Sequence, residues 1–217
     1  METKNQPMLQ PDIRKPGSRR NKTHIQRLVG TAILAALVIV LQFFVSIPIG
    51  MFTITLTLVP IMIGAILYGP AIGAFLGGLF GAVVSIQVVT GAAGAISFAM
   101  FEYTPVITIL LCVLKGVAAG FVSGLLYRVF EKMGRKKLGT ILAAVACPIT
   151  NTGIFALGML VFYKTLLDGW AIDFAFANAL SFLMIGMIGL NFVIEFAVNV
   201  ALIPAVLRII TLVKRKL

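Results

Sequence analysis

The chain has 217 residues, of which 60% are hydrophobic and 12% are charged, and its mean hydropathy is +1.07. This composition excludes a soluble globular domain and predicts an integral membrane protein. The net charge of +11 would suggest nucleic-acid binding in a soluble protein, but in a membrane protein it reports the topology of the loops. A hydrocarbon core of about 30 Å needs helices of about 20 residues, so the chain has room for about six spans.

Residues 1–27 are polar and basic, and we predict that they form a disordered cytoplasmic arm. A six-helix membrane domain is expected over 28–210, followed by a basic cytoplasmic tail at 211–217. The first span is predicted at about 28–45 and is followed by a turn, SIPIG. The alternating opening of FTITLTL (52–58) predicts an extended segment before a short second helix that ends at Gly69. The other four spans are predicted at about 70–89, 105–127, 138–163 and 176–207, with a Gly/Ala loop at 90–95 and a connecting stretch to 103 between the first two of them.

The cations are concentrated in three segments of the chain. The amino-terminal arm, residues 128–137 and the carboxyl end together hold 16 of the 18 Lys and Arg residues. With six spans, these three segments lie on one side of the membrane. Cytoplasmic loops collect Lys and Arg, so both termini are predicted to be cytoplasmic in a multi-pass protein of the cell membrane.

One lysine, Lys115, lies inside a predicted span. The sequence separation between Lys115 and Arg128 equals the separation between Glu195 and Arg208. At a rise of about 1.5 Å per residue, both side chains lie about 20 Å from the cytoplasmic charge layer. Asn151 is nearly as far from Lys137 and falls at the same depth on a third helix. The sequence therefore predicts a polar layer slightly past the middle of the membrane, toward its outer side.

This layer has two interpretations. A charge at the centre of a span costs about 2.5 to 3.5 kcal/mol on insertion scales, so Lys115 and Glu195 should face inward. They could form only a buried ion pair that joins two helices. The accompanying Thr152 and Asn191 favour a ligand pocket instead, since buried polar groups need partners. Asn191, Glu195 and Asn199 follow at intervals of four and share one helix face.

Several kinds of chemistry are not indicated. The sequence has no phosphate-binding GxxxxGK[ST] loop, no HExxH and no Cys/His cluster with metal spacing, and its single histidine, His24, lies in the arm. The chain is therefore not expected to be an enzyme or to hold a metal or cofactor. Transport against a gradient would need a coupled ion or a partner ATPase.

Small residues recur at intervals of four in three places. Glycines stand at 69, 73, 77 and 81 and at 116, 120 and 124, which predicts flat helix faces that pack closely inside the bundle. The first span carries Ala32 and Ala36 in an AxxxA pattern, and that face could meet another protein.

Together these features resemble a known family of transport proteins. Six short helices with cytoplasmic ends, the AxxxA of the first helix and the stretch FTITLTLVPIMIGAILYGPAIGAFLGG (52–78) look like the substrate-binding S component of an energy-coupling factor (ECF) vitamin transporter. The resemblance covers about residues 28–210. It implies high-affinity capture of a vitamin from outside and docking, through Ala32 and Ala36, on a membrane coupling protein that carries two ATPases. ATP would be used by those partners.

The resemblance also implies a pocket formed by the loops after the first and third helices and by the outer halves of the last three. This adds Glu102 and Tyr103 to the layer of Lys115, Asn151, Thr152, Asn191 and Glu195. The segments TNTGIF (150–155) and NFVIEFAVN (191–199) look most like the pantothenate-type branch. A biotin- or riboflavin-type S component, a solitary ion-coupled carrier that uses Glu195, and a scaffold that binds no solute remain as alternatives.

Overall fold

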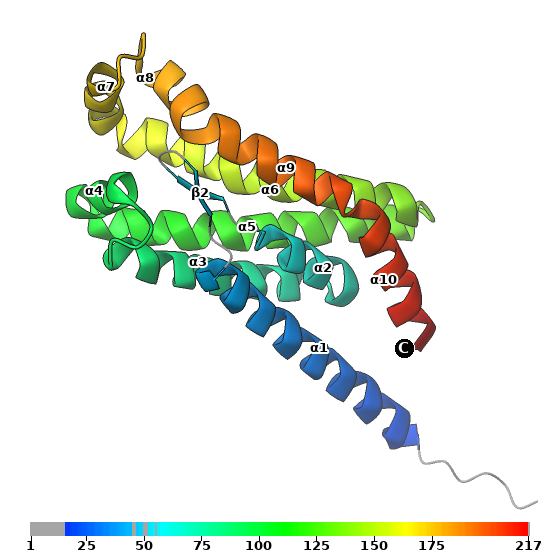
Figure 1. The fold of residues 1–217 in the computed structure, drawn as a ribbon. Coiled ribbons are helices and arrows are strands. Elements are labelled where there is room, and N and C mark those ends of the chain that lie inside the picture. The colour runs from blue at the N-terminus through cyan, green and yellow to red at the C-terminus, as the bar shows by residue number, and fades with distance from the viewer. Residues whose placement is uncertain (1–15, 45–46, 50–51, 55, 217) are drawn as a thin grey trace, which may run out of the picture.

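The structure, a computed structural model, describes residues 16–44, 47–49, 52–54 and 56–216 as an elongated helical bundle (Figure 1). The elements in chain order are α1 (Pro16–Phe44), β1 (Ile47–Ile49), β2 (Phe52–Ile54), α2 (Leu58–Tyr68), α3 (Pro70–Val89), α4 (Ala95–Tyr103), α5 (Pro105–Lys132), α6 (Lys136–Phe162), α7 (Lys164–Asp173), α8 (Ala179–Ser181), the π-helix η1 (Phe182–Gly189), α9 (Leu190–Ala201) and α10 (Ile203–Lys216). In Figure 1, α5 and α6 lie along the bundle and α1 crosses it at an angle.

Five helical segments in the described part of the chain are long and apolar enough to cross a membrane. They are 24–44 in α1, α3, α5, α6 and the continuous stretch 179–201. The helix α2 has only 11 residues, which cover about 16 Å, about half of a hydrocarbon core. The structure therefore supports a helical membrane bundle with one small two-stranded sheet, whereas six spans are not confirmed.

Several predicted boundaries are corrected. The helix α1 begins at Pro16, so residues 16–27 of the predicted arm are helical, and 1–15 lie outside the described residues. The predicted turn at 46–50 contains β1, which pairs antiparallel with β2. The connecting stretch 95–103, for which no helix was predicted, is α4, and the segment after 163 forms α7. The predicted last span is divided into η1, α9 and α10.

The turn between α2 and α3 follows from its two central residues. Gly69 has φ +101°, a left-handed conformation that favours glycine and ends α2. Pro70 then begins α3, since its fixed φ suits the first helical position. A backbone N–H at this position would have no partner within the helix, so its absence in proline costs nothing. The two helices are therefore joined without a loop.

The helices α3 and α5 are in direct backbone contact through their glycines. A Cβ atom on Gly77 would lie 2.0 Å from the carbonyl oxygen of Gly116, and one on Gly73 would lie 2.4 Å from that of Gly120. The predicted packing of the two glycine faces is confirmed. In a membrane, where helix association depends on van der Waals contact, such close approach is a main source of stability.

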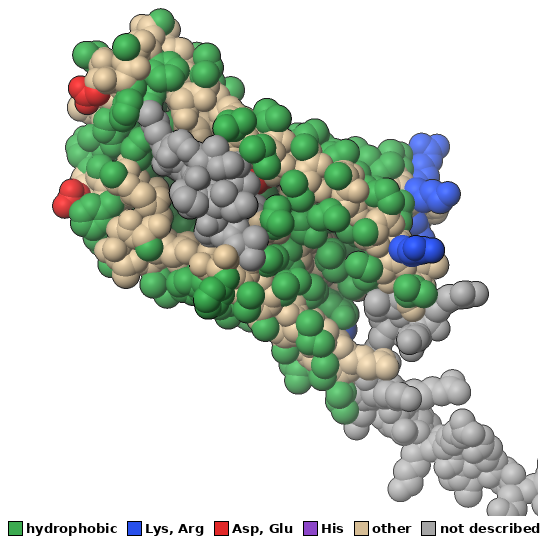
Figure 2. Space-filling model, viewed as in Figure 1, with side chains coloured by type: hydrophobic (Ala, Val, Ile, Leu, Met, Phe, Trp, Pro, Cys, Tyr) green, Lys and Arg blue, Asp and Glu red, His purple; other side chains and the backbone are tan. Residues whose placement is uncertain are grey.

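Charged side chains separate to the two ends of the bundle. Figure 2 shows the Lys and Arg side chains on the visible face at the end where α5 turns into α6, and the Asp and Glu side chains at the end formed by α4 and α7. The start of α1 and the carboxyl end of the chain lie toward the basic end (Figure 1). On this face the bundle thus has one basic end and one acidic end.

We expect Gly77→Val to destabilise the bundle by about 1 to 3 kcal/mol, the usual cost of overpacking. A side chain at this position would clash with the backbone of Gly116, which cannot move aside. The measurement is thermal unfolding of the purified protein in detergent. Gly153→Ala in α6 is the control, since a Cβ at Gly153 has no atom within 4 Å. Equal melting temperatures for the two variants would contradict the packing assigned to α3 and α5.

Candidate ligand-binding cavity

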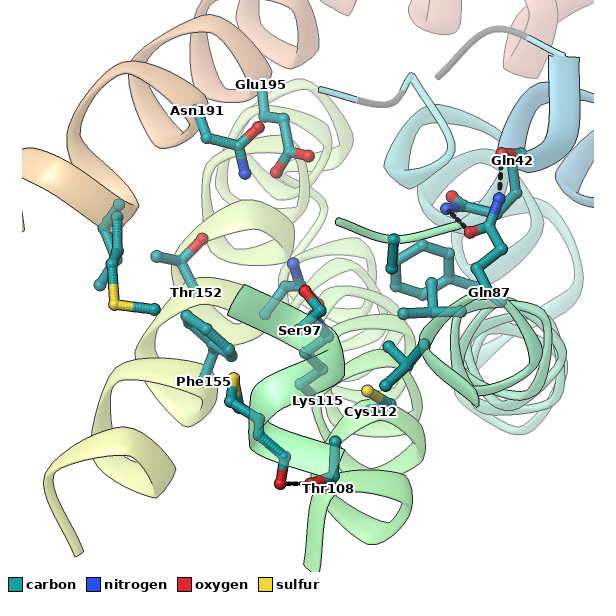
Figure 3. Close-up of a pocket in the computed structure, with 18 residues that line it drawn as sticks. Gln42, Gln87, Ser97, Thr108, Cys112, Lys115, Thr152, Phe155, Asn191 and Glu195 are labelled. Atoms are coloured by element: carbon teal, nitrogen blue, oxygen red, sulfur yellow. Dashed lines mark hydrogen bonds between the residues drawn. The ribbon is translucent and has the colours of Figure 1, made fainter. Parts of the chain in front are cut away.

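A cavity of about 110 Å³ lies between helices from both halves of the chain (Figure 3). Its apolar lining includes Phe80 and Val84 of α3 and Phe155 of α6. Its polar lining consists of Gln42, Gln87, Ser97, Thr108, Lys115, Asn151, Thr152, Asn191 and Glu195. Apolar walls with a few converging polar groups are typical of the lining of small-molecule sites.

Lys115 reaches the cavity from α5, directly before the Gly116 that contacts α3. Its Nζ lies 5.0 Å from the centroid of the Phe155 ring, within the range of a cation–π interaction. Within the described residues, Lys115 forms no ion pair with Glu195 or another carboxylate. The interpretation of Lys115 as one half of a buried ion pair therefore has no support in this structure.

Two asparagines in the lining have unsatisfied oxygens. Asn151 of α6 is 7% exposed, and no described residue donates a hydrogen bond to its Oδ1. The Oδ1 of Asn191 on α9 is buried in the same way. An amide oxygen left without a donor in a buried place costs about 1 to 3 kcal/mol. Both side chains would gain from a partner that enters the cavity and lets their amides reorient.

Glu195 lines the cavity from α9, one turn beyond Asn191, and is 5% exposed. Figure 3 shows Asn191 and Glu195 side by side on their helix, above Thr152. Asn199 follows on the same face but lies outside the cavity lining, where its Nδ2 donates to the backbone oxygen of Glu195 at 2.8 Å. The predicted alignment of the three side chains is therefore present, and two of them reach the cavity.

The structure brings together Lys115, Asn151, Thr152, Asn191 and Glu195, as the depth argument predicts. It does not bring Glu102 and Tyr103 to them. Both side chains are exposed near the carboxyl end of α4, and neither lines the cavity. The ring of Tyr103 lies 6.1 Å from that of Tyr163 instead.

Sequence reasoning missed a buried amide pair, Gln42 and Gln87, in the opposite wall of the cavity. Gln42 Nε2 donates to Gln87 Oε1 at 2.7 Å, and Gln87 Nε2 donates to the Gln42 backbone oxygen at 3.1 Å. Thr57, before α2, donates to Gln42 Oε1 at 3.0 Å. The pair joins α1 to α3. The feature of the sequence that could have indicated it is the presence of one glutamine inside each of these apolar helices.

Comparison with known proteins identifies the family. Residues 26–207 match the family described as "ECF transporter, substrate-specific component". This chain belongs to that family. As an S component it is a substrate-binding subunit of a transporter and not an enzyme, as predicted. A comparison with curated protein sequences gave no match.

Among solved structures, the chain is similar to ThiT from Listeria monocytogenes, with a TM-score of 0.58 and 19% sequence identity. The alignment covers 87% of this chain and 98% of ThiT. At this identity the similarity concerns the fold alone.

We expect Gln87→Leu to lower the stability of the S component by about 1 to 3 kcal/mol, because both hydrogen bonds between Gln42 and the Gln87 side chain are lost. Thermal unfolding in detergent is the measurement. Ser85→Ala on the same helix is the matched control, since the Ser85 hydroxyl bonds only to Gly81 of its own helix. If the melting temperature of Gln87→Leu equals that of the control, the amide pair contributes no net stability.

Proposed function

We propose that this S component captures pantothenate, or a vitamin with the same carboxylate and hydroxyl chemistry, in the cavity around Lys115. The observation that carries the proposal is the cation itself. Lys115 projects into the cavity and has no carboxylate partner among the described residues. An anionic ligand would supply a charge-assisted hydrogen bond, which is about twice as strong as a neutral one.

The other polar groups of the cavity suit the rest of such a molecule. Asn151 and Asn191 each carry a buried oxygen without a donor in the described structure. Hydroxyl groups and an amide N–H of a ligand could supply those donors once the side chains turn toward it. Phe80 and Phe155 provide apolar walls. A biotin- or riboflavin-type ligand is the alternative. The mass-spectrometry experiment described below decides between these ligands and pantothenate.

The scaffold alternative predicts a dry interior and a Lys115–Glu195 ion pair. The cavity and the position of Lys115 over Phe155 argue against it. A solitary ion-coupled carrier using Glu195 is opposed by membership in a family of transporter components, which are subunits of a larger assembly.

The proposed assembly places the basic end in the cytoplasm, with both termini there and with α2 completing a six-segment bundle in the cell membrane. The arrangement of the chain ends and of the cations in Figures 1 and 2 supports this orientation. Transport would then depend on a membrane coupling protein and two ATPases, which use the ATP. The candidate contact is Ala32 and Ala36, both exposed on α1.

The ligand is tested by purifying the chain and analysing co-purified small molecules by mass spectrometry, followed by calorimetry with a panel of vitamins. We expect pantothenate to be recovered. Recovery of biotin or riboflavin would keep the S component function but overturn the ligand assignment. Recovery of no vitamin, with no heat of binding across the panel, would overturn the proposed function.

We expect Lys115→Ala to weaken pantothenate binding by at least about 1.5 kcal/mol, typical of a lost hydrogen bond to a charged group. Lys132→Ala is the matched control, because Lys132 is exposed at the far end of the same helix. Calorimetry of both variants, each checked for an unchanged melting temperature, is the measurement. Equal affinities would remove Lys115 from the ligand contact.

We expect Ala36→Trp to abolish uptake into vesicles that contain the coupling protein and ATPases, while vitamin binding to the isolated chain is retained. A bulky side chain would prevent close approach of α1 to its partner. Leu157→Trp, at an exposed apolar site on α6, is the control and should leave uptake intact. Uptake by the chain alone, without the partner subunits, would contradict the dependence on an ATPase.

A further inference from the structure

The carboxyl-terminal helix, α10, begins where a full membrane span has already ended. The stretch 179–201 has 23 residues and covers about 35 Å, enough for a hydrocarbon core of about 30 Å. A further 14 residues follow in α10, equal to about 21 Å of helix. If α10 continued straight, it would leave the bilayer.

The structure turns α10 aside instead. Figure 1 shows α10 running across the direction of α5 and α6, near the end where these two helices meet. The turn follows Ala201. Pro204 lacks the backbone N–H that would continue the helical hydrogen bonds of α9 at this point. Val206 and Ile210 are 1% and 7% exposed, and α10 contacts α2 and α6. One face of α10 is thus held against the bundle.

The rest of α10 combines apolar and basic residues. Ile209 and Leu212 are 38% and 57% exposed, and Arg208 is exposed beside them. The last turn of the helix contains Lys214, Arg215 and Lys216, and the sequence of α10 has no acidic residue. Apolar side chains at the acyl boundary with cations at the headgroups are typical of helices that lie in the membrane interface.

The surroundings of α10 agree with this composition. The α5–α6 turn at the same end of the bundle carries one carboxylate, Glu131, beside the cations Lys132, Arg135, Lys136 and Lys137. The described protein surface there is therefore net positive and does not attract a basic helix. Anionic lipid headgroups are the complementary charge that such a helix meets in a membrane.

We propose that α10 lies along the cytoplasmic surface of the bilayer and that the net positive charge of its sequence attracts the headgroups of anionic phospholipids. Each cation strengthens attachment to an anionic surface roughly fivefold at low salt. The helix would thereby hold the basic end of the bundle at a fixed depth. This role does not depend on which vitamin the cavity binds.

The test uses the full chain in vesicles of equal parts phosphatidylglycerol and phosphatidylcholine. Retained lipids are counted by native mass spectrometry after gentle extraction. The α10 variant is Arg208→Gln/Lys214→Gln/Arg215→Gln/Lys216→Gln. The control, Lys132→Gln/Arg135→Gln/Lys136→Gln/Lys137→Gln, removes the same charge from the same end but outside α10.

We expect the α10 variant to retain at least tenfold less phosphatidylglycerol than the unmodified chain, while the control stays within twofold of it. Equal losses in the two variants would show that the whole basic end attracts lipid and would overturn the role of α10. Undiminished retention in the α10 variant would do the same.

A second measurement places the helix independently of its charges. Cys112 and Cys147 are buried, so a spin label on Leu212→Cys would be the accessible one. The measurement compares the exposure of the spin label to oxygen with its exposure to an aqueous nickel chelate. We expect this ratio to place the label at headgroup depth in the phosphatidylglycerol vesicles. Exposure to the chelate alone, or shielding from both reagents by another protein surface, would overturn the proposal.

Discussion

The close contact of α3 and α5 is the constraint on which the cavity depends. Gly73 and Gly77 lie against the backbone at Gly120 and Gly116, so the two helices cannot rotate about their axes without a clash. Lys115 precedes Gly116 in α5, and successive helical residues are about 100° apart. Packing of the glycine against α3 therefore directs the lysine to the side, where α6 and α9 complete the cavity. The glycine pattern determines the direction of the cation as well as the stability of the bundle.

The stabilisation of Lys115 is incomplete in the described structure. A lysine at the centre of a span costs about 2.5 to 3.5 kcal/mol on insertion scales. Its cation–π contact with Phe155 returns about 0.5 to 2 kcal/mol, depending on how far the pair is desolvated. The remainder has to come from polar neighbours, water or a ligand. In the proposed function, an anionic ligand supplies part of that remainder.

The sequence predicted the helical bundle, the end of α2 at Gly69 and the polar layer of Lys115, Asn151 and Glu195, because each has a local cause. Apolar length defines a span, a Gly-Pro step ends a helix, and the fixed rise per helical residue converts sequence separation into depth. The helices α4 and α7, the turn into α10 and the π-helix η1 were not predicted. They depend on how the helices pack against one another, and hydropathy alone does not contain that information.

The same rule that identified Lys115 applies to Gln42 and Gln87, since each places a polar side chain in an apolar helix. The outcomes differ because the glutamines, far apart in the sequence, satisfy each other, whereas no described carboxylate pairs with the lysine. Whether two buried polar groups meet depends on the rotation and register of both helices, which are tertiary properties. A sequence can therefore show which polar groups a membrane protein buries. Only the fold separates those that join helices from those that remain available to a ligand.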